Sequence, residues 1–258
     1  MACGFLDLVF PDECRICERP LRELSRIPVC SACLTQPAPL HAEYFCRICG
    51  TPFLDPRPLD EAGLCALCRS GLNSFDQVYA AGAYEGALRK LIHLFKFEGV
   101  RPLARPLGAF LAAALPRERT FDAVVPMPLH WRRRWQRGFN QSELLAREIA
   151  RRWRMPIRRL VRRKRATAPQ AGLTSAQRRT NVQGAFETIP GARFEGLRIL
   201  LIDDVLTTGA TADACARVLK RAGAASVALL TLARRDRREG LTELEMANAA
   251  VAASRVEP

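Results

Sequence analysis

The 258-residue sequence predicts an α/β domain with a central, mostly parallel sheet, preceded by a small cysteine-rich module. Three observations lead to this prediction. After about residue 75, short apolar runs that suit strands buried on both faces alternate with stretches of helical periodicity. Nine of the ten cysteines come before residue 70. A chain of this length suits one such domain together with one small metal-binding module.

Eight of the early cysteines form four Cys-x-x-Cys pairs, and the pairs repeat. Cys14-Arg15-Ile16-Cys17 returns as Cys46-Arg47-Ile48-Cys49, and each copy is followed by a second pair. Two such pairs separated by a dozen or more residues are the ligand arrangement of a zinc ribbon. The repeat favours consecutive pairing, and interleaved pairing stays open. Consecutive pairing gives one site of Cys14, Cys17, Cys30 and Cys33 and another of Cys46, Cys49, Cys65 and Cys68.

Disulfides and redox chemistry fit these cysteines less well than structural zinc does. Disulfides require an oxidising compartment, whereas the N-terminus lacks a basic start and Asp7 interrupts its apolar run, unlike a signal peptide. Four redox Cys-x-x-Cys motifs in series do not fit a thioredoxin-like unit. Zinc also explains how roughly 70 residues with few large apolar groups fold. We expect a double zinc-ribbon module over residues 1–72, and a cytoplasmic protein without membrane insertion, because no apolar run approaches a membrane span.

The second domain opens with a strand and two helical stretches. A strand is expected at about Gln77–Tyr84, because the residues there are largely apolar. Helical spacing follows, and a second helical stripe begins at Leu103. The first helix is expected to bury Leu88, Leu91, Ile92 and Phe95.

A second buried strand is expected at Phe121–Val125. It ends at Pro126-Met127-Pro128, where two prolines forbid a helix and impose a rigid turn. A helix from Gln141 to about Arg154 follows, with Asn140 and Glu143 as its capping residues.

The run from Ile199 to Thr211 carries the strongest functional signal. Four apolar residues suit a strand buried in a parallel sheet, and Asp203 and Asp204 follow where that strand ends. A hydroxyl-rich loop comes next, and a helix is expected from Ala212 to about Arg221. A strand, a loop and a helix N-terminus in this order suit a phosphate. Adjacent carboxylates can accept hydrogen bonds from two vicinal hydroxyls, so the run indicates a sugar phosphate.

Other phosphate motifs are absent, and the charge of the chain is uneven. The sequence has neither a Gly-Lys-Ser/Thr triplet nor a Gly-x-Gly-x-x-Gly after a strand. Residues 1–75 sum to −2 and residues 76–258 to +16, which add to the net +14 of the chain. The positive second domain suits polyphosphate or nucleic acid. The densest stretch is Arg151–Arg165, with nine basic residues of fifteen, and an ordinary solvated surface explains it equally well.

These motifs resemble known families. The run Ile199–Thr211 resembles the phosphoribosyl-pyrophosphate (PRPP) signature of type I phosphoribosyltransferases. From about residue 10 to 235 the chain is similar to the ComF family, through Pro126-x-Pro128, Arg137-Gly138-Phe139-Asn140-Gln141, the segment from Gly172 to Phe186, and the PRPP run. That family consists of bacterial phosphoribosyltransferase-like proteins with an N-terminal double zinc ribbon, and some members are needed for natural DNA uptake.

The resemblance implies a type I phosphoribosyltransferase fold over residues 73–235 and a role for each motif. It implies that Asp203 and Asp204 hold the ribose hydroxyls, with Arg137 beside them as a catalytic candidate. It implies that the 5′-phosphate is held by Val205, Leu206, Thr207, Thr208, Gly209, Ala210 and Thr211. The implied pyrophosphate loop is Pro126, Met127, Pro128 and Arg134. The polar segment Lys164–Val182 matches the mobile active-site loop, with the candidates Gln170, Arg178, Arg179 and Asn181.

Two functions follow as hypotheses. The first is an enzyme that binds PRPP with Mg²⁺ and transfers phosphoribosyl to a nitrogen nucleophile, releasing pyrophosphate. The second is a factor that handles single-stranded DNA in natural transformation and docks competence proteins through its zinc module. Both keep two structural Zn²⁺ ions. From Arg234 onwards the sequence is charged and then Ala-rich, which predicts a C-terminal tail, assigned to residues 236–258.

Overall fold

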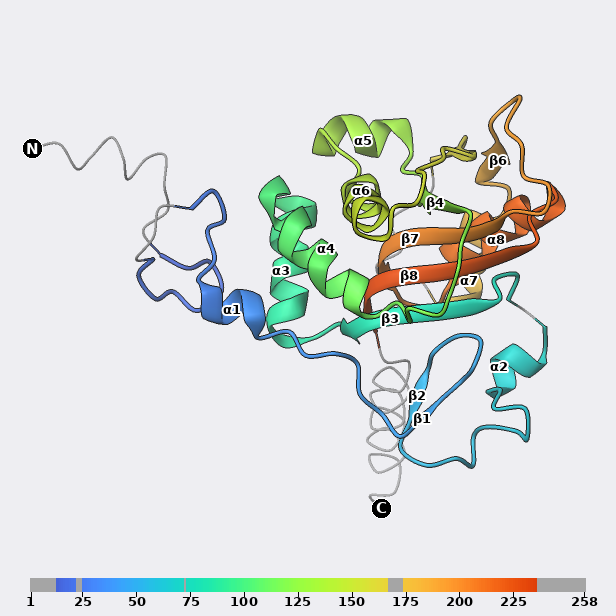
Figure 1. Cartoon of the computed structure of the whole chain (residues 1–258), viewed down its shortest axis with the longest axis horizontal. Coiled ribbons are helices and arrows are strands. Elements are labelled where there is room, and N and C mark those ends of the chain that lie inside the picture. The colour runs from blue at the N-terminus through green and yellow to red at the C-terminus, as the bar shows by residue number, and fades with distance from the viewer. Residues whose placement is uncertain (1–12, 22–24, 72, 167–173, 236–258) are drawn as a thin grey trace, which may run out of the picture.

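The computed structural model describes residues 13–21, 25–71, 73–166 and 174–235. Its centre is a four-stranded sheet in the order β3-β8-β7-β4 (Figure 1), in which every neighbouring pair is parallel. The strands are β3 (Gln77–Ala83), β4 (Ala123–Pro126), β7 (Arg198–Leu206) and β8 (Ser226–Arg234). The expected α/β fold with a central, mostly parallel sheet is confirmed. The sequence pattern did not predict β8.

Strand β7 lies in the middle of the sheet and is buried on both faces. Ile199 and Leu201 belong to the apolar cluster on one face, whereas Leu200 and Ile202 belong to the cluster on the other. All four side chains are fully buried. A strand covered on both faces needs apolar residues at every position rather than at alternate ones, which explains the uninterrupted apolar run.

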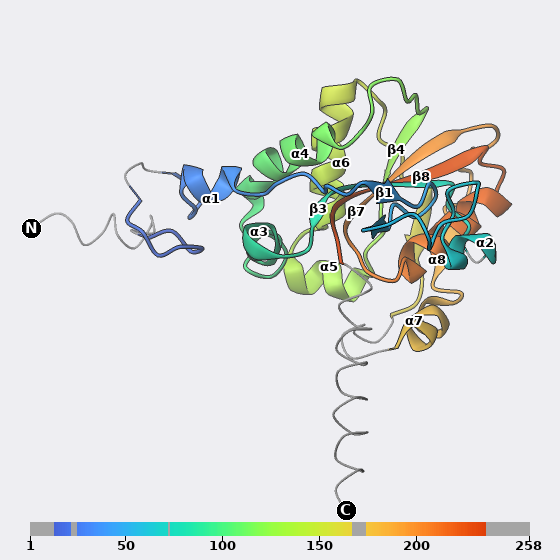
Figure 2. The ribbon, with the colours of Figure 1, turned by 90° about the horizontal axis from the view of Figure 1, so that it is seen from below.

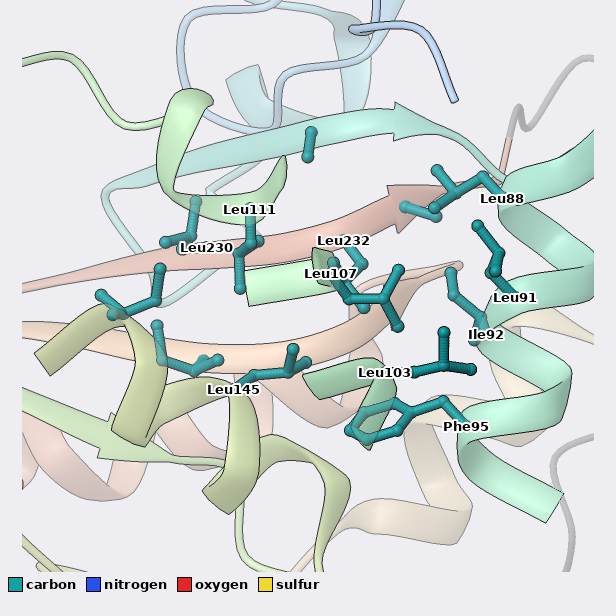
Figure 3. Close-up of a cluster of buried hydrophobic side chains, with 14 of the residues drawn as sticks. Leu88, Leu91, Ile92, Phe95, Leu103, Leu107, Leu111, Leu145, Leu230 and Leu232 are labelled. Carbon is teal, nitrogen blue, oxygen red and sulfur yellow. The ribbon is translucent and has the colours of Figure 1, made fainter. Parts of the chain in front are cut away.

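One face of the sheet is covered by α3 (Gly86–Phe97), α4 (Ala104–Ala113) and α6 (Gln141–Trp153), with a 3₁₀ turn at Arg101–Leu103 before α4. Leucine and isoleucine side chains of these helices fill the space above β7 and β8 (Figure 3). The predicted stripe of α3 is buried as expected. It comprises Leu88, Leu91, Ile92 and Phe95.

The opposite face is covered by α8 (Ala210–Arg221), which begins two residues earlier than expected. Gly209 precedes it with φ 81°, a left-handed conformation that glycine adopts without strain. Beside α8 lie α7 (Ser175–Val182) and an antiparallel pair of short strands, β5 (Val161–Arg163) and β6 (Phe186–Thr188). The short helix α5 (Trp131–Arg137) connects β4 to α6 at the periphery of the molecule (Figure 1).

The two cysteine repeats join different apolar clusters of the second domain. The first, which contains α1 (Ser31–Thr35), lies beside α3, and its cysteines join the apolar cluster of α3, α4 and α6. The second contains β1 (Tyr44–Phe45), β2 (Pro52–Phe53) and α2 (Ala66–Arg69), and its cysteines join the cluster of α8 (Figures 1 and 2). The segment between the repeats crosses the edge strand β3, where the Leu40 N–H donates to the Ala81 carbonyl at 2.9 Å.

The charged composition that begins at Arg234 does not mark the end of the folded domain. Arg234 is the last residue of β8 and is 1% exposed, so it belongs to the sheet. The Arg234 guanidinium can be buried because it donates hydrogen bonds to Cys49 and Thr51 of the second cysteine repeat. The tail residues 236–258 lie outside the described part of the chain. Among the described residues, no helix combines the length and the apolar character that a membrane crossing requires.

A close contact between α4 and α6 gives a test of this packing. A Cβ at Gly108 would lie 2.5 Å from the Cβ of Glu148, so any larger side chain must push the two helices apart. Gly108→Val is expected to lower the free energy of unfolding by roughly 1–3 kcal/mol in urea denaturation. Ala113→Val on the exposed face of α4 is the control and should change it by roughly 0.5 kcal/mol. Equal effects of the two substitutions would contradict the close packing.

Candidate functional site

Two adjacent carboxylates mark the carboxyl end of β7. Asp203 and Asp204 follow the buried apolar run, and the pairing of β7 with β4 and β8 holds the strand straight up to this point. Alternation along the strand sends the two side chains to different faces. Asp204 is 4% exposed and Asp203 is half-buried. The carboxyl ends of parallel strands are where ligands bind in open α/β sheets.

Asp204 is held by groups from three elements. The Lys96 ammonium at the end of α3 lies 2.7 Å from its Oδ2, and the Gln141 amide at the start of α6 donates to the same oxygen at 3.2 Å. The Val205 N–H donates to Oδ1 at 2.8 Å. Burial alone would raise the pKa of Asp204, but Lys96, the Val205 N–H and Arg137 together hold that pKa below its ordinary value. Asp204 is therefore ionised.

Asp203 has weaker partners and behaves differently. Its Oδ1 accepts from the Ser142 hydroxyl at 3.3 Å and from the Asp204 N–H at 2.9 Å. Burial, followed by the negative charge of Asp204, raises the pKa of Asp203 to about 7. Near neutral pH the pair therefore carries between one and two negative charges, so it can both accept hydrogen bonds from hydroxyls and donate one.

A cavity of ≈ 520 Å³ opens above this pair. Its cationic residues are Lys96, Arg133, Arg137 and Arg163, and among the described lining residues only Asp203 and Asp204 are acidic. Burial and the neighbouring Arg133 lower the pKa of Arg163 to about 10, and burial also lowers the pKa of Arg137. Both arginines still carry their charge at neutral pH. The cavity therefore combines four cationic side chains with two carboxyl groups. This combination suits a polyanion that also carries hydroxyls.

The hydroxyl-rich loop lies between β7 and α8. Thr207 and Thr208 are half-buried, and Gly209 leaves the first turn of α8 without a side-chain cap. The N–H groups of that turn, together with the helix dipole, suit an anion. Thr211 and Val205 line the cavity, whereas Leu206 and Ala210 are buried in the core and shape the loop from beneath.

The predicted pyrophosphate loop is only partly at this cavity. Met127 and Pro128 line it, and the Asn140 amide ties the turn to α6 by donating to the Met127 carbonyl at 3.0 Å. Asn140 also caps α6 as predicted, accepting from the Ser142 N–H. Pro126 and Arg134 instead line a second cavity on the other side of α5, where Arg134 lies 3.7 Å from Glu143.

The predicted mobile-loop residues lie away from the carboxylate pair. Arg178, Arg179 and Asn181 are on α7, a helix that begins with a capping box of Thr174 and Gln177 and lies beside α8 (Figure 2). Within the described parts of the chain, no residue of α7 lines the cavity. Gln170 lies outside the described residues. The mobile-loop assignment stays a prediction.

The residues that hold the carboxylates were not predicted from the sequence. Lys96, Gln141, Ser142 and Arg163 were not identified as site residues. Lys96 could have been found from the sequence, because it follows Leu88 and Ile92 at a spacing of four residues and so lies on the buried side of α3. A lysine in line with a buried apolar row needs a carboxylate partner. Arg163 gave no comparable signal, since its position depends on the pairing of β5 with β6.

The eight cysteines form two clusters, paired consecutively. The Sγ atoms of Cys14, Cys17, Cys30 and Cys33 lie within 4.8 Å of one another, and so do those of Cys46, Cys49, Cys65 and Cys68. Backbone N–H groups point at the sulfurs, as at Cys14 Sγ and Cys46 Sγ, and Asn73 donates to Cys68 Sγ at 3.2 Å. Four close sulfurs with N–H donors fit a tetrahedral metal–thiolate site, which supports structural zinc.

The second cluster is connected to the sheet by a buried arginine. The Arg234 guanidinium donates to the Cys49 carbonyl and to the Thr51 hydroxyl, and Thr51 is 2.9 Å from Cys49 Sγ. A tetrathiolate zinc site carries a net negative charge, which a buried guanidinium offsets. This explains how an arginine is buried at the end of β8.

Comparisons with known proteins agree with this arrangement. A family model described as a phosphoribosyl transferase domain matches residues 140–247, and one described as a double zinc ribbon domain matches residues 5–69. Competence protein F of Haemophilus influenzae is 30% identical over 227 residues, 85% of this chain and 90% of that protein. DNA utilization protein YhgH of Salmonella typhimurium is 32% identical over 238 residues, 88% and 99% of the two chains. The chain belongs to the ComF family.

More distant similarities are weaker. Competence protein ComFC of Bacillus subtilis, another protein similar to this ComF-family chain, is 29% identical over 201 residues, 74% of this chain and 78% of that protein. A solved structure of the allosteric regulatory enzyme of purine biosynthesis aligns with 22% identity and a TM-score of 0.37, covering 51% of this chain and 26% of its own. That TM-score is too low to add to the argument.

The clusters predict a zinc content near two ions per chain, because each provides four sulfur ligands. Metal analysis of protein purified without a chelator should give this ratio. Cys14→Ser should reduce it to roughly one, since a lost thiolate ligand removes one site and its share of the folding free energy. A ratio near zero, or disulfides detected by mass, would overturn the zinc assignment.

The raised pKa of Asp203 predicts a pH-dependent stability. The unfolded chain releases this proton near its ordinary pKa of 3.8, whereas the folded protein keeps it to about 7. Between these values the folded state binds more protons, so the contribution of Asp203 to the free energy of unfolding falls as pH rises. Asp203→Asn should remove that contribution, so that the variant gains stability relative to the wild type between pH 5 and pH 8 in urea denaturation. A constant difference across this range would contradict the raised pKa.

Proposed function

We propose that the chain binds PRPP with Mg²⁺ at the end of β7 and transfers its phosphoribosyl group to a nitrogen nucleophile, releasing pyrophosphate. The observation that carries this proposal is one cavity in which Asp203 and Asp204, four cationic side chains and Thr211 at the N-terminus of α8 meet. A ribose with phosphates at both ends presents the complementary groups: hydroxyls for the carboxylates and anions for the cations and the helix.

The carboxylates act by orienting the sugar. Asp203 and Asp204 lie at the base of the cavity and accept hydrogen bonds from the vicinal ribose hydroxyls. The Lys96 ammonium, 2.7 Å from Asp204, keeps this carboxylate ionised in a buried position. Holding the ribose in one orientation presents its C1 to the incoming nucleophile from a constant direction.

The cations act on the leaving group. Pyrophosphate gains negative charge as its bond to C1 breaks, and Arg137, Arg133 and Arg163 provide fixed positive charge on the wall of the cavity. Bound with PRPP, Mg²⁺ supplies further positive charge to the departing pyrophosphate, and Asp203 and Asp204 are the carboxylates that would hold it. The 5′-phosphate lies against the loop from Val205 to Thr211 and the N-terminus of α8.

Thermal denaturation tests the binding step. PRPP with Mg²⁺ should raise the melting temperature, because a ligand that binds the folded state stabilises it by mass action. The double variant Asp203→Asn, Asp204→Asn should lose this shift and stay folded, since both side chains lie at a strand end. Asp122→Asn is the matched control, because Asp122 precedes β4 and pairs with Arg198 at the opposite edge of the sheet. A shift in the double variant equal to the wild-type shift would mean that the pair is not the ribose site.

Release of pyrophosphate tests the transfer step. The wild-type protein with PRPP and Mg²⁺ should release it in the presence of one or more nitrogen acceptors, and the double aspartate variant should not. Binding of PRPP without release by any acceptor would leave the chain as a PRPP-binding protein rather than a transferase.

A second candidate function is the handling of single-stranded DNA. Two relatives are named Competence protein F and DNA utilization protein YhgH. Residues 76–258 carry the positive charge of the chain, a sum of +16 against −2 for residues 1–75. We propose that the positively charged surface of residues 76–258 binds single-stranded DNA. We also propose that the zinc ribbons dock partner proteins inside the cell. Binding of an oligonucleotide should weaken steeply with salt, because neutralised phosphates release their counterions.

A further inference from the structure

Helix α5 presents two tryptophans to solvent. Trp131 is 64% exposed and Trp135 is 84% exposed, whereas Trp153, the third tryptophan of the chain, packs partly against the core. Large aromatic side chains bury most of their surface when the fold allows it, so two neighbouring exposed rings indicate an interaction surface.

The two rings lie on one side of the helix. Residues i and i+4 of a helix are neighbours on its surface, about 5–6 Å apart at Cβ. The Arg132 guanidinium lies 5.3 Å from the centre of the Trp131 ring. His130 caps the helix by accepting from the Arg132 N–H at 3.3 Å, which holds the first turn in place. The rings are therefore presented from a capped, ordered turn.

The surroundings of the rings are cationic. Four of the seven residues of α5 are arginines and none is acidic. Glu143 is the carboxylate that faces this helix, and it is shared by Arg134, Arg147 and Arg159. One negative charge among three arginines leaves this surface positive, which is complementary to a polyanion.

A second cavity, of ≈ 320 Å³, continues the surface beyond Trp131. Arg134, Arg159 and Arg162 line it, together with the apolar side chains of Leu129 and Ile189. An aromatic ring, an apolar floor and a cationic rim are the features with which proteins hold bases and phosphates of a single strand.

The stretch Arg151–Arg165, which the sequence marks only by its charge density, supplies Arg159 and Arg162 to this cavity but no exposed aromatic ring. Arg151 and Arg152 pair with Glu148, and Arg162 and Lys164 pair with Glu187. The one tryptophan in the stretch, Trp153, is partly buried. Charge density alone therefore does not locate the surface, because the exposed aromatic rings lie on α5, next to arginines of both segments.

We infer that α5 and the adjoining cavity form a binding surface for single-stranded nucleic acid, with bases stacked on Trp131 and Trp135 and phosphates on Arg132, Arg134 and Arg159. This inference rests on the proposed handling of DNA and names the surface that performs it. A duplex keeps its bases stacked on one another, so the exposed rings select an unpaired strand.

The location places a bound strand next to the proposed PRPP site. Arg133 and Arg137 of α5 line the cavity above the carboxylate pair, whereas Trp131 and Arg134 of the same helix line the second cavity. Pro128 and Arg163 line both. One helix therefore separates the two sites, and the rings lie on the side away from the carboxylates.

Fluorescence anisotropy of a labelled oligo-dT strand tests the inference, with the full-length protein at two salt concentrations. The wild type should bind and lose affinity at the higher salt. Trp131→Gln with Trp135→Gln should weaken binding at least tenfold, because the bases lose the aromatic rings on which they stack. The salt dependence of this variant should stay near that of the wild type, since its phosphate contacts remain. Trp131→Phe with Trp135→Phe keeps the rings and should bind nearly as the wild type does.

The matched control is Arg151→Gln with Arg152→Gln, which removes two charges that do not line this cavity and should change the affinity less than twofold. If the wild type does not bind oligo-dT, the proposed DNA role fails and the inference with it. If the wild type binds but the Trp→Gln variant binds equally well, the role stands and the surface is wrong. Equal binding of the matching duplex or of anionic phospholipid vesicles, lost in the Trp→Gln variant, would show that the rings contact a different partner. Circular dichroism of each variant verifies that the fold is retained.

Discussion

Two carboxylates, adjacent in the sequence and placed at the end of a buried strand, are the constraint around which the domain is organised. Burial and the negative charge of Asp204 both disfavour the ionised form of Asp203. Asp203 and Asp204 are tolerated because the structure brings compensating groups to them from distant parts of the chain. Lys96 comes from the end of α3, Gln141 and Ser142 from the start of α6, and the Val205 N–H from β7 itself.

The same constraint explains why the helices lie where they do. The C-terminal turn of α3 and the N-terminal turn of α6 must both reach the carboxyl edge of the sheet. Their apolar stripes, packed on β7 and β8, position them there (Figure 3). The core thus supports the site directly, because moving either helix would leave a buried carboxylate without its partner.

Local patterns predicted much of this architecture, and long-range contacts account for what was missed. The apolar run at Ile199, the stripe of α3 and the cap at Asn140 depend on neighbouring residues, and all three are found as predicted. The role of Arg234 depends on a cysteine site 185 residues away, so its charge suggested a solvated tail. The pairing of Lys96 with Asp204 likewise joins residues far apart in the sequence. The repeat favoured consecutive zinc pairing, but no local sequence pattern indicated that the two ribbons join different apolar clusters.

The attachment of the first ribbon to α3 has a consequence for communication along the molecule. Arg15 pairs with Glu98 at the C-terminal end of this helix, and Lys90 donates to the Ile16 carbonyl at 3.0 Å. Two positions before Glu98, the same helix carries Lys96, the counter-ion of Asp204. A protein docked on the ribbon and a ligand at the carboxylates would thus both contact groups that are attached to helix α3. If docking shifts that helix, thermodynamic linkage requires each to change the affinity of the other by the same factor. Helix α3 is thus the element that connects the first ribbon to the carboxylate pair.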